Sequence, residues 1–479
     1  MSQAPQNMDG CSTPLCVDLD GTLTPIDTLH ESLLALAHVA PRTLLKLPSA
    51  LIRGKAAFKR TVAEVAVPDV TLLPLREELV QWLQMQHTAG RQLWLVTAAD
   101  RRIADAVAAH LGLFAGVICS DGEHNLAGSA KGAALIERFG ERGFDYAGNE
   151  SKDLDVWRAA RRAIVIGSET LARRAAAVTE VEKRVPAQRA SLKVWARALR
   201  LHQWAKNVLV FLPLLLAHQL FRPNALLHAL LAFLAFGLCA SSVYLVNDLF
   251  DLASDRRHPR KRTRPFASGR LPAKAGSVAL LLLAAAALLA SLTTPRFCAL
   301  LAGYYALTWA YSIRLKRAAL LDVMTLACLY TVRIVAGAAA TEVPLSFWLL
   351  AFSVFIFLSL GIVKRYSEID DQVRAGSAKN SSRGYHTSDL PLLLSLGTAS
   401  GYCAIIVAAL YIMSADSQAL YRHTQPLWLL CPILLYWLNR IWLLTTRGQM
   451  PDDPVIFALR DRRSLVIGVL LVAIVIISI

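Results

Sequence analysis

Residues 247–255 read Asn247-Asp248-Leu249-Phe250-Asp251-Leu252-Ala253-Ser254-Asp255 and follow a long apolar run, 225–246. Asp251 and Asp255 are four residues apart, so on a helix their carboxylates share one face, and Asp248 lies one turn before Asp251. Oxygen ligands at this spacing suit Mg²⁺, which proteins usually hold with a few carboxylates plus substrate phosphates. We therefore expect a Mg²⁺ site at the end of a membrane helix, formed by Asn247, Asp248, Asp251 and Asp255.

The segment directly after this acidic block is basic. Residues 256–264 read Arg-Arg-His-Pro-Arg-Lys-Arg-Thr-Arg, and guanidinium and ammonium groups bind the oxygens of a diphosphate. An acidic block followed at once by a basic one predicts Mg²⁺-dependent chemistry on a diphosphate at a membrane surface. The alternative interpretation is an ordinary solvated loop beside a membrane helix.

The second half of the chain consists mainly of apolar runs. The chain has 479 residues and is 55% hydrophobic, and a helix needs about 20 apolar residues to cross a bilayer. Nine candidate runs occur, at 208–221, 225–246, 272–292, 296–313, 319–340, 345–363, 391–413, 425–444 and 463–479. We expect an all-α polytopic membrane domain with about nine transmembrane helices.

Basic residues gather in the loops after the second, fourth, sixth and eighth runs, whereas the opposite loops hold few. The positive-inside rule then makes this a multi-pass protein of the cell inner (cytoplasmic) membrane, with a cytoplasmic N-terminal domain. The net charge of +16 follows from this bias, so we expect no nucleic-acid partner. The first 30 residues are polar and acidic, which predicts no signal peptide. The eight cysteines form no CxxC pair, which predicts reduced thiols.

Residues 1–182 have the pattern of a soluble domain. Short apolar strands are expected at 14–20, 92–96, 144–147 and 163–166. They alternate with helical segments, which predicts a parallel, Rossmann-like α/β sheet with polar residues at the strand C-terminal ends. Residues 27–75 are expected to form a helical cap. A basic linker with an amphipathic interfacial helix, 183–206, would lead into the membrane domain, 207–479.

Four groups of residues resemble the motifs of haloacid dehalogenase-like (HAD-like) phosphatases: Asp18-Leu19-Asp20-Gly21-Thr22, Thr97, Lys131, and Gly148-Asn149 with Asp153. The resemblance implies a nucleophile at Asp18, an acid/base at Asp20, and phosphate binding by Thr97 and Lys131. It also implies a Mg²⁺ site formed by Asp18, Asp20, Asn149 and Asp153. An ionised carboxylate can attack phosphorus once Mg²⁺ and a lysine neutralise the phosphate. The family usually has Asp where this chain has Asn149, so an active phosphatase and a fold kept without catalysis both remain open.

The membrane half resembles the intramembrane UbiA-type prenyltransferase superfamily through the Asn-Asp-x-x-Asp-x-x-x-Asp pattern after the second run. That family typically carries a second Asp-rich motif after the sixth run. Here the loop reads Lys364-Arg365-Tyr366-Ser367-Glu368-Ile369-Asp370-Asp371. This departure, together with the stretches 201–211 and 258–269, is similar to the decaprenyl-phosphate phosphoribosyltransferase branch.

The resemblance to that branch implies transfer of 5-phosphoribose from phosphoribosyl diphosphate to a polyprenyl phosphate, with Mg²⁺ as cofactor. The N-terminal domain would then remove the 5-phosphate, and the oligomeric state stays open. Catalytic roles would fall to Asp251, Asp255 and Glu368. The expected substrate-binding residues are Gln203, Lys206, Asn207, Arg257, Lys261, Arg264, Arg314, Lys316, Arg333, Lys364, Arg365 and Tyr366.

The cations are expected because the site must hold a diphosphate, a 5-phosphate and a lipid phosphate. Arg333 lies inside the fifth apolar run, where a charge is costly and therefore usually faces a cavity or a partner. Two other functions stay open. One is prenyl transfer from a polyprenyl diphosphate to an aromatic or quinone precursor. The other is a transporter or lipid-binding scaffold with a regulatory soluble domain.

Overall fold

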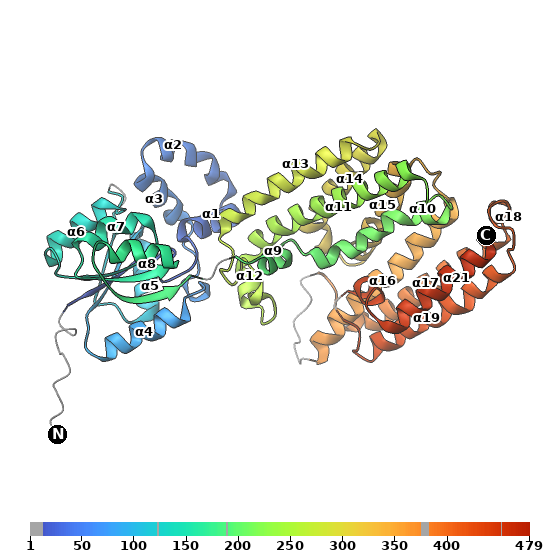
Figure 1. Cartoon of the computed structure of the whole chain (residues 1–479). Coiled ribbons are helices and arrows are strands. Elements are labelled where there is room, and N and C mark those ends of the chain that lie inside the picture. The colour runs from blue at the N-terminus through green and yellow to red at the C-terminus, as the bar shows by residue number, and fades with distance from the viewer. Residues whose placement is uncertain (1–12, 122–123, 188–189, 375–382, 452) are drawn as a thin grey trace, which may run out of the picture. The chain divides into compact units, whose positions relative to one another are not determined.

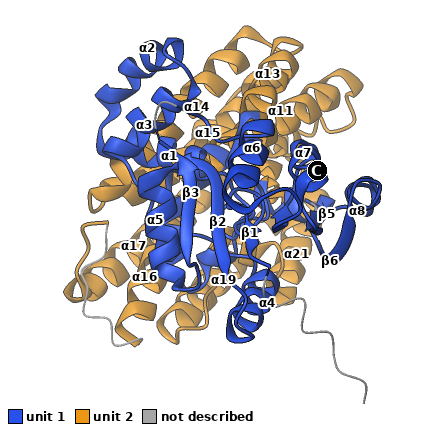
Figure 2. Ribbon diagram, turned by 90° about the vertical axis from the view of Figure 1, so that its left-hand side faces the viewer, with its two compact units in different colours: residues 1–198, 245–277 blue, residues 199–244, 278–479 orange. Residues whose placement is uncertain are grey.

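The computed structural model describes residues 13–121, 124–187, 190–374, 383–451 and 453–479. Residues 1–12 lie outside the described residues. They include Cys11 and the first part of the segment that was expected to contain no signal peptide. The chain forms two compact units: unit 1 comprises Met1–Ala198 with Leu245–Ser277, and unit 2 comprises Leu199–Tyr244 with Val278–Ile479 (Figure 2). The acidic stretch 247–255 thus packs with the N-terminal domain, although the predicted domain boundaries place it in the membrane domain.

Unit 1 contains a six-stranded, wholly parallel sheet in the order β3-β2-β1-β4-β5-β6. The strands are β1 (Leu15–Val17), β2 (Leu93–Asp100), β3 (Gly116–Ser120), β4 (Asp145–Gly148), β5 (Arg162–Gly167) and β6 (Glu180–Pro186). The predicted parallel α/β fold is confirmed. Strands β3 and β6 were not predicted, and β6 occupies the first residues of the segment expected to be a linker.

Helices cover both faces of this sheet (Figure 1). They are α4 (Glu77–Thr88), α5 (Arg101–Leu111), α6 (Ser129–Phe139), η4 (Ser151–Asp153), α7 (Leu154–Ala159) and α8 (Glu169–Ala176). Neighbouring residues of β1 point to opposite faces, as a strand requires. Leu15 and Val17 pack into the core lined by α4 and α5, whereas Cys16 packs into the core lined by α6, α7 and α8.

The segment expected to be a cap is helical. It contains α1 (Thr28–Val39), η2 (Pro41–Lys46), α2 (Leu47–Ile52), α3 (Lys55–Val65) and η3 (Val70–Leu72). Leu36, Val62 and Ala66 form a small core of its own between α1 and α3. The rest of unit 1 includes α9 (Leu192–Ala198), α12 (Leu252–Arg257), η6 (Lys261–Thr263) and η7 (Ala273–Ser277).

Unit 2 is entirely helical over the residues that the structure describes. Its first half contains η5 (Leu201–Phe211), α10 (Leu212–Leu216), most of α11 (Pro223–Phe250), α13 (Val278–Ser291), α14 (Pro295–Ile313), η8 (Leu315–Arg317) and α15 (Leu321–Thr341). Its second half contains α16 (Phe347–Arg374), η9 (Thr387–Asp389), α17 (Leu390–Met413), α18 (Ala415–Leu420), η10 (Pro426–Leu429), α19 (Leu430–Thr446), α20 (Pro454–Ala458) and α21 (Arg462–Ser478).

Helix α15 is shared by the two main cores of unit 2. Leu329 and Ala336 pack with α11 and α14, whereas Ala327 and Ile334 pack with α16 and α17. Gly337 lets η5 approach closely, because a Cβ there would lie only 2.1 Å from the Val210 carbonyl oxygen. Side chains of α15 therefore reach the interior of the unit on two sides.

Six helices are long and apolar enough to cross a membrane: Pro223–Phe250, Ala273–Ser291, Leu321–Thr341, Phe347–Arg374, Thr387–Met413 and Pro426–Thr446. The expected number of nine is therefore too high for the described residues by this measure. The first expected span, 208–221, is instead the end of 3₁₀ helix η5 and the five-residue helix α10. The runs 296–313 and 463–479 form α14 and the 17-residue α21.

Candidate active sites

The end of β1 positions the first candidate site. Asp18 follows Val17 directly, and its backbone N–H donates to the Ala147 carbonyl of β4 at 3.0 Å. The Asp18 side chain is buried, and Nζ of Lys131 donates to its Oδ1 at 2.7 Å. Lys131 comes from the first turn of α6. The sequence motifs that predicted these two residues therefore meet at the C-terminal edge of the sheet, where α/β folds usually bind ligands.

Tyr146 holds Lys131 from a second direction. Nζ of Lys131 donates to the Tyr146 hydroxyl at 3.0 Å, and that hydroxyl donates to Oδ1 of Asp153 at 3.2 Å. Burial opposes the charged form of Lys131, but the charges of Asp18 and Asp153 outweigh it and raise the pKa. The ammonium group thus stays charged at neutral pH, the state that neutralises a phosphate. Sequence analysis missed Tyr146, because a tyrosine in a buried strand has no signal that separates it from the core.

Asn149 lies beside the candidate nucleophile. Oγ1 of Thr22 is 3.2 Å from Oδ2 of Asp18 and 3.0 Å from Oδ1 of Asn149. Gly21 has φ +77°, and a Cβ at this position would lie 2.2 Å from Nδ2 of Asn149. Only glycine therefore lets the loop after β1 approach the loop after β4 this closely. The amide oxygen of Asn149 is placed to act as a neutral ligand next to Asp18.

Asp153 supports the loop that carries Asn149. Its Oδ2 accepts the backbone N–H groups of Asn149 and Glu150, both at 2.8 Å. With Oδ1 bonded to Tyr146, both carboxylate oxygens have protein partners. Burial and the charge of Asp18 raise the pKa of Asp153. Its contacts are those of a positioning residue, whereas the resemblance predicts a metal ligand.

The Asp20 carboxyl group has the properties of a proton donor. Its Oδ1 accepts the backbone N–H of Thr28, at the start of the cap, at 2.8 Å. Burial, followed by the charge of Asp27, raises the pKa of Asp20 to about 7. Part of the population therefore carries a proton at neutral pH, as an acid that protonates a leaving group requires.

Two further polar residues shape this site. Thr97 is fully buried, and its hydroxyl accepts the backbone N–H of Ala99 at 3.0 Å, so it stabilises the irregular last residues of β2, where the pairing with β3 shifts register. Lys59, from cap helix α3, donates to the Ala98 carbonyl at 2.7 Å and to Oδ1 of Asn125 at 3.0 Å. Burial lowers the pKa of Lys59. Sequence analysis missed Lys59, because its neighbours in the chain give no motif.

The oxygen ligands at this edge fit Mg²⁺ by their chemistry. Across the described ranges, no group of three or more His, Cys, Asp or Glu side chains is arranged as a metal site. The first site instead offers two carboxylates, Asp18 and Asp20, and the amide oxygen of Asn149. An all-oxygen set of this kind is what Mg²⁺ prefers, with water and substrate phosphate completing the coordination.

The acidic stretch forms the second candidate site, also within unit 1. Helix α11 ends at Phe250, and Asp251 is the N-cap of α12. Nη1 of Arg264 lies 3.2 Å from Oδ1 of Asp248 and 2.6 Å from Oδ2 of Asp255. Burial raises the pKa of Asp255 against the opposing charge of Arg264. Of the four predicted ligands, Asp248 and Asp255 are thus brought together by their common contact with Arg264.

A buried ion pair attaches this second site to the cap. The guanidinium of Arg256, next to Asp255, donates to both carboxylate oxygens of Glu31 in α1 at 2.9 Å. Each of the two side chains is only 7% exposed, and Nε of Arg256 also donates to the Ala267 carbonyl at 3.0 Å. No motif predicts this contact, since the two residues lie 225 positions apart in the sequence.

The remaining basic residues of this stretch are exposed. Arg257 lies 3.2 Å from Asp69, and both side chains are well exposed. Lys261 begins η6 and is exposed as well. Arg264 is the predicted cation of this stretch that contacts Asp248 and Asp255.

Unit 2 contains a buried group of predicted substrate-binding residues. Lys206 pairs with Asp453, and Asn207 Oδ1 accepts from Nε of Arg333 at 3.0 Å. Arg333 also donates to the Tyr304 hydroxyl at 2.9 Å. Although burial opposes it, the charges of Lys206 and Lys364 lower the pKa of Asp453. Nδ2 of Asn207 is a buried donor with no hydrogen-bond partner in the part of the chain that the structure describes.

Arg365 and Glu368, which were expected to act on the substrate, pair with each other in this structure. Arg365 is fully buried, 2.7 Å from Oδ2 of Asp322, and it also pairs with Glu368. Tyr385 donates to the other oxygen of Asp322. Arg365 was expected to face a phosphate, and in this structure its guanidinium is held by the carboxylates of Asp322 and Glu368. Inside an apolar bundle, carboxylates from α15 and α16 are the nearest groups that can neutralise a guanidinium.

The other predicted residues of unit 2 lie near its surface or in packing contacts. Tyr366 packs edge-on against Trp442, with ring centroids 6.2 Å apart. Gln203, Lys316 and Lys364 are half-buried, and Arg314 is exposed. Asp453 is a residue that sequence analysis missed, since it lies 247 positions from Lys206.

Comparison with known proteins agrees with the membrane fold. The model of the UbiA prenyltransferase family matches residues 208–460. The chain belongs to the UbiA prenyltransferase family. It is therefore a multi-pass membrane transferase, fused to an N-terminal parallel α/β domain.

Two curated relatives of this UbiA-family chain bear on its two parts. The protein y4nM of Sinorhizobium fredii is 40% identical, and the match covers 96% of this chain and 89% of that protein. A decaprenyl-phosphate phosphoribosyltransferase of Mycobacterium tuberculosis is 32% identical, over 56% of this chain and 87% of that protein. The first match spans both parts of the chain, which indicates that the fusion occurs in another bacterial protein.

Solved structures show weaker similarity. A UbiA homologue from Archaeoglobus fulgidus bound to GPP and Mg²⁺ has 16% identity and a TM-score of 0.46, covering 60% of this chain and 99% of that one. A probable phosphoserine phosphatase from Vibrio cholerae has 13% identity and a TM-score of 0.27, covering 36% of this chain and 61% of that one.

Proposed function

We propose that this chain transfers 5-phosphoribose from phosphoribosyl diphosphate to a polyprenyl phosphate in the cytoplasmic membrane, and that its cytoplasmic N-terminal domain then removes the 5-phosphate. The similarity to a decaprenyl-phosphate phosphoribosyltransferase over 87% of that protein's length supports the first step. The Asp18–Lys131 pair, with Asn149 and Asp20 beside it, supports the second.

In the transfer step, the bond between C1 of the ribose and the diphosphate oxygen breaks, and an oxygen of the lipid phosphate forms the new bond to C1. Mg²⁺, when bound, neutralises the departing diphosphate. The contact of one Arg264 nitrogen with both Asp248 and Asp255 supports a role for these two carboxylates in binding a cation together. The lipid phosphate is already ionised at neutral pH, so no strong base is required.

Buried cations of unit 2 support a phosphate-binding role in this step. Lys206 pairs with Asp453, and Arg333 donates to Asn207, whose own Nδ2 is a buried donor without a partner in the described part of the chain. A buried donor of this kind costs free energy unless a ligand satisfies it. A phosphate oxygen supplies that acceptor and balances the excess positive charge.

In the second step, a carboxylate oxygen of Asp18 attacks phosphorus, and the bond between phosphorus and the ribose O5 breaks. Lys131 balances the charge of the phosphoryl group, and Asp20 donates its proton to O5. Water then cleaves the aspartyl phosphate, with Asp20 accepting its proton, and inorganic phosphate leaves. The product is a polyprenylphosphoryl ribose.

The full chain purified in detergent, incubated with Mg²⁺, radiolabelled phosphoribosyl diphosphate and polyprenyl phosphates, tests both steps. We expect label in the extracted lipid and release of inorganic phosphate after transfer. Consumption of a polyprenyl diphosphate with an aromatic acid, and none of the ribosyl donor, would replace this proposal with prenyl transfer. Lipid binding with no turnover of either donor would point to a scaffold or transporter.

A further inference from the structure

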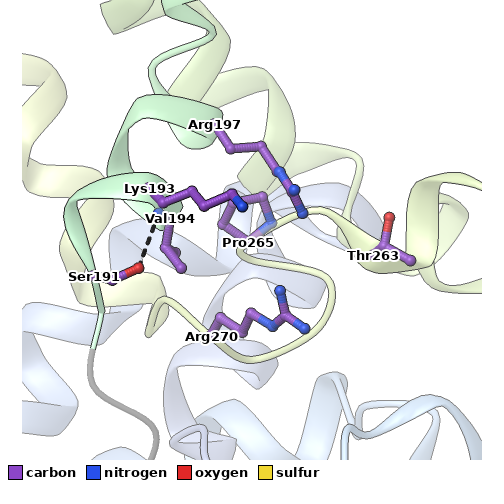
Figure 3. A pocket seen from close by; sticks show the side chains of 7 residues that line it. All are labelled: Ser191, Lys193, Val194, Arg197, Thr263, Pro265 and Arg270. Carbon is purple, nitrogen blue, oxygen red and sulfur yellow. Dashed lines mark hydrogen bonds between the residues drawn. The ribbon is translucent and has the colours of Figure 1, made fainter.

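A basic pocket in unit 1 lies outside both candidate active sites. It has a volume of about 200 Å³ and is lined by Ser191, Lys193, Val194, Arg197, Thr263, Pro265 and Arg270. Figure 3 shows Lys193 and Arg197 reaching it from one helix, and Arg270 from the loop on the opposite side. The helix is α9, and the loop follows η6.

The charge of this pocket is uncompensated. Three of its seven lining residues are cationic and none is acidic. The side chains of Lys193, Arg197 and Arg270 form no hydrogen bond or ion pair with another described residue, unlike the neighbouring Arg264, which contacts two carboxylates. Three like charges around one small space repel each other, and an anion with several oxygen atoms relieves that repulsion.

The loop that carries Arg270 is fixed before any ligand arrives. Its backbone closes on itself, with the N–H of Leu271 donating to the Pro265 carbonyl at 3.0 Å. Phe266 is buried, and Gly269 has φ +70°. A Cβ at Gly269 would lie 2.7 Å from Cγ of Pro25, so the loop is packed against the start of the cap. Arg270 is therefore presented from a preorganised position, which reduces the entropy lost on binding.

Size and surroundings indicate the ligand. Pockets for whole small molecules usually measure roughly 300–1,000 Å³, so about 200 Å³ suits a phosphate group with a small part of its carrier. The side chain of Leu192, next to Lys193, is 89% exposed. An exposed leucine beside phosphate-binding cations is the pattern of a segment that lies on a membrane surface.

We propose that this pocket binds a phosphate group, carried either by an anionic phospholipid or by a phosphorylated sugar. The proposal does not depend on the reaction proposed above. Guanidinium groups from two sides can donate to different oxygens of one phosphate, and the ammonium of Lys193 adds a third contact.

Native mass spectrometry of the delipidated full chain in detergent tests the pocket. The probes are phosphatidylglycerol, phosphatidylcholine as the neutral-headgroup comparison, and ribose 5-phosphate. The test variant is Lys193→Gln/Arg197→Gln/Arg270→Gln. The control is Arg260→Gln/Arg262→Gln, which removes exposed charge from the same loop without touching the pocket. Both variants must unfold at the wild-type melting temperature. We expect this because all five substituted residues are exposed.

We expect the test variant to bind one of the anionic probes at least about tenfold more weakly than wild type, because it loses three charge-assisted contacts to the phosphate oxygens. Loss for phosphatidylglycerol alone identifies a lipid headgroup, and loss for ribose 5-phosphate alone identifies a sugar phosphate. Equal losses in the control and test variants, or no loss in the test variant, would overturn the proposal. If only a destabilised test variant can be obtained, Arg270→Gln and Arg262→Gln provide the same comparison with one charge each.

Discussion

Unit 1 contains two carboxylate sites that hold their acids in different ways. In the first candidate site, the phosphatase-like site named for the resemblance of its sequence motifs, Asp18 pairs with Lys131, and both side chains are at most 10% exposed. In the acidic stretch, one nitrogen of Arg264 contacts both Asp248 and Asp255, and the Arg264 side chain is 28% exposed. Lys131 is held in place by Tyr146 and Asp18, whereas Arg264 belongs to a loop at the surface.

This difference bears on chemistry. Lys131 contacts the hydroxyl of Tyr146 as well as the carboxylate of Asp18, so its ammonium group is held in place from two sides. Arg264 occupies the same carboxylate oxygens that a divalent cation needs. The phosphatase-like site is thus preorganised, whereas cation binding at the acidic stretch requires Arg264 to share or release its partners. Substitutions that separate the two activities test this comparison.

The largest effect is expected for Asp18→Asn. An amide cannot attack phosphorus, so phosphate release should fall by roughly 10³-fold or more. Ribosyl transfer to the lipid should be unchanged, because its reacting groups lie elsewhere. Phosphate release and lipid labelling, measured in the same reaction, check both parts. Asp155→Asn is the matched control, since Asp155 is exposed and pairs only with the nearby Arg158 among described residues. Equal loss of both activities in Asp18→Asn would show that the two steps are not separate.

The next effect is expected for Asp255→Asn. It removes one of the two acids that share Arg264, and metal stabilisation of a leaving diphosphate is worth several kcal/mol. Transfer should therefore fall by about 10²-fold or more, and phosphate release from a supplied 5-phosphorylated substrate should remain. Normal transfer that is still abolished by a Mg²⁺ chelator would place the metal away from Asp255.

A third substitution tests how the two sites are joined. Glu31→Gln leaves the buried guanidinium of Arg256 without its charged partner, which should cost about 2 kcal/mol of stability. Thermal unfolding of the full chain measures this loss. The control is Glu64→Gln in the same cap, where the pairs with Arg60 and Arg102 are exposed and together worth at most about 1 kcal/mol. An equal change in both variants would mean that the Arg256–Glu31 pair contributes nothing beyond a surface ion pair.

The sequence predicts the residues of the first candidate site better than the arrangement of the acidic stretch, and the reason is physical. Asp18, Lys131 and Asn149 were predicted together from the resemblance to HAD-like phosphatases. The loops with Asp18 and Asn149 meet because parallel strands bring their C-terminal ends to one edge, whatever the length of chain between them. The arrangement at the acidic stretch was predicted less well. Asp251 and Asp255 have helical spacing, but the turn at Asp251 leaves Asp248 and Asp255 as the pair that shares Arg264.

Cations were the least predictable residues. The sequence shows that Lys206, Arg256 and Arg365 lie near helix ends, which is where membrane proteins collect positive charge. Their partners Asp453, Glu31 and Asp322 are known only from the fold. A buried cation pairs with a carboxylate that is close in space but distant in sequence, so no local sequence pattern predicts which carboxylate it is. Residues predicted to bind phosphate therefore divide into those with protein partners and those, such as Arg314, that are exposed at the surface.

The smallest effect is expected at Asn149, and it addresses the preorganised site directly. Asn149→Asp replaces a neutral oxygen ligand beside Asp18 with a charged one, and ligand charge is a main determinant of affinity for hard cations. The Mg²⁺ concentration for half-maximal phosphate release should fall by up to about tenfold, whereas Asn149→Ala should raise it. The added carboxylate also faces Asp18 and the hydroxyl of Thr22, and this repulsion without metal limits the gain. If the Mg²⁺ concentration for half-maximal phosphate release decreases from Ala to Asn to Asp at position 149, this side chain is a metal ligand. If Asp and Ala shift the requirement in the same direction, the side chain acts only through packing against Gly21, and the metal is held without it.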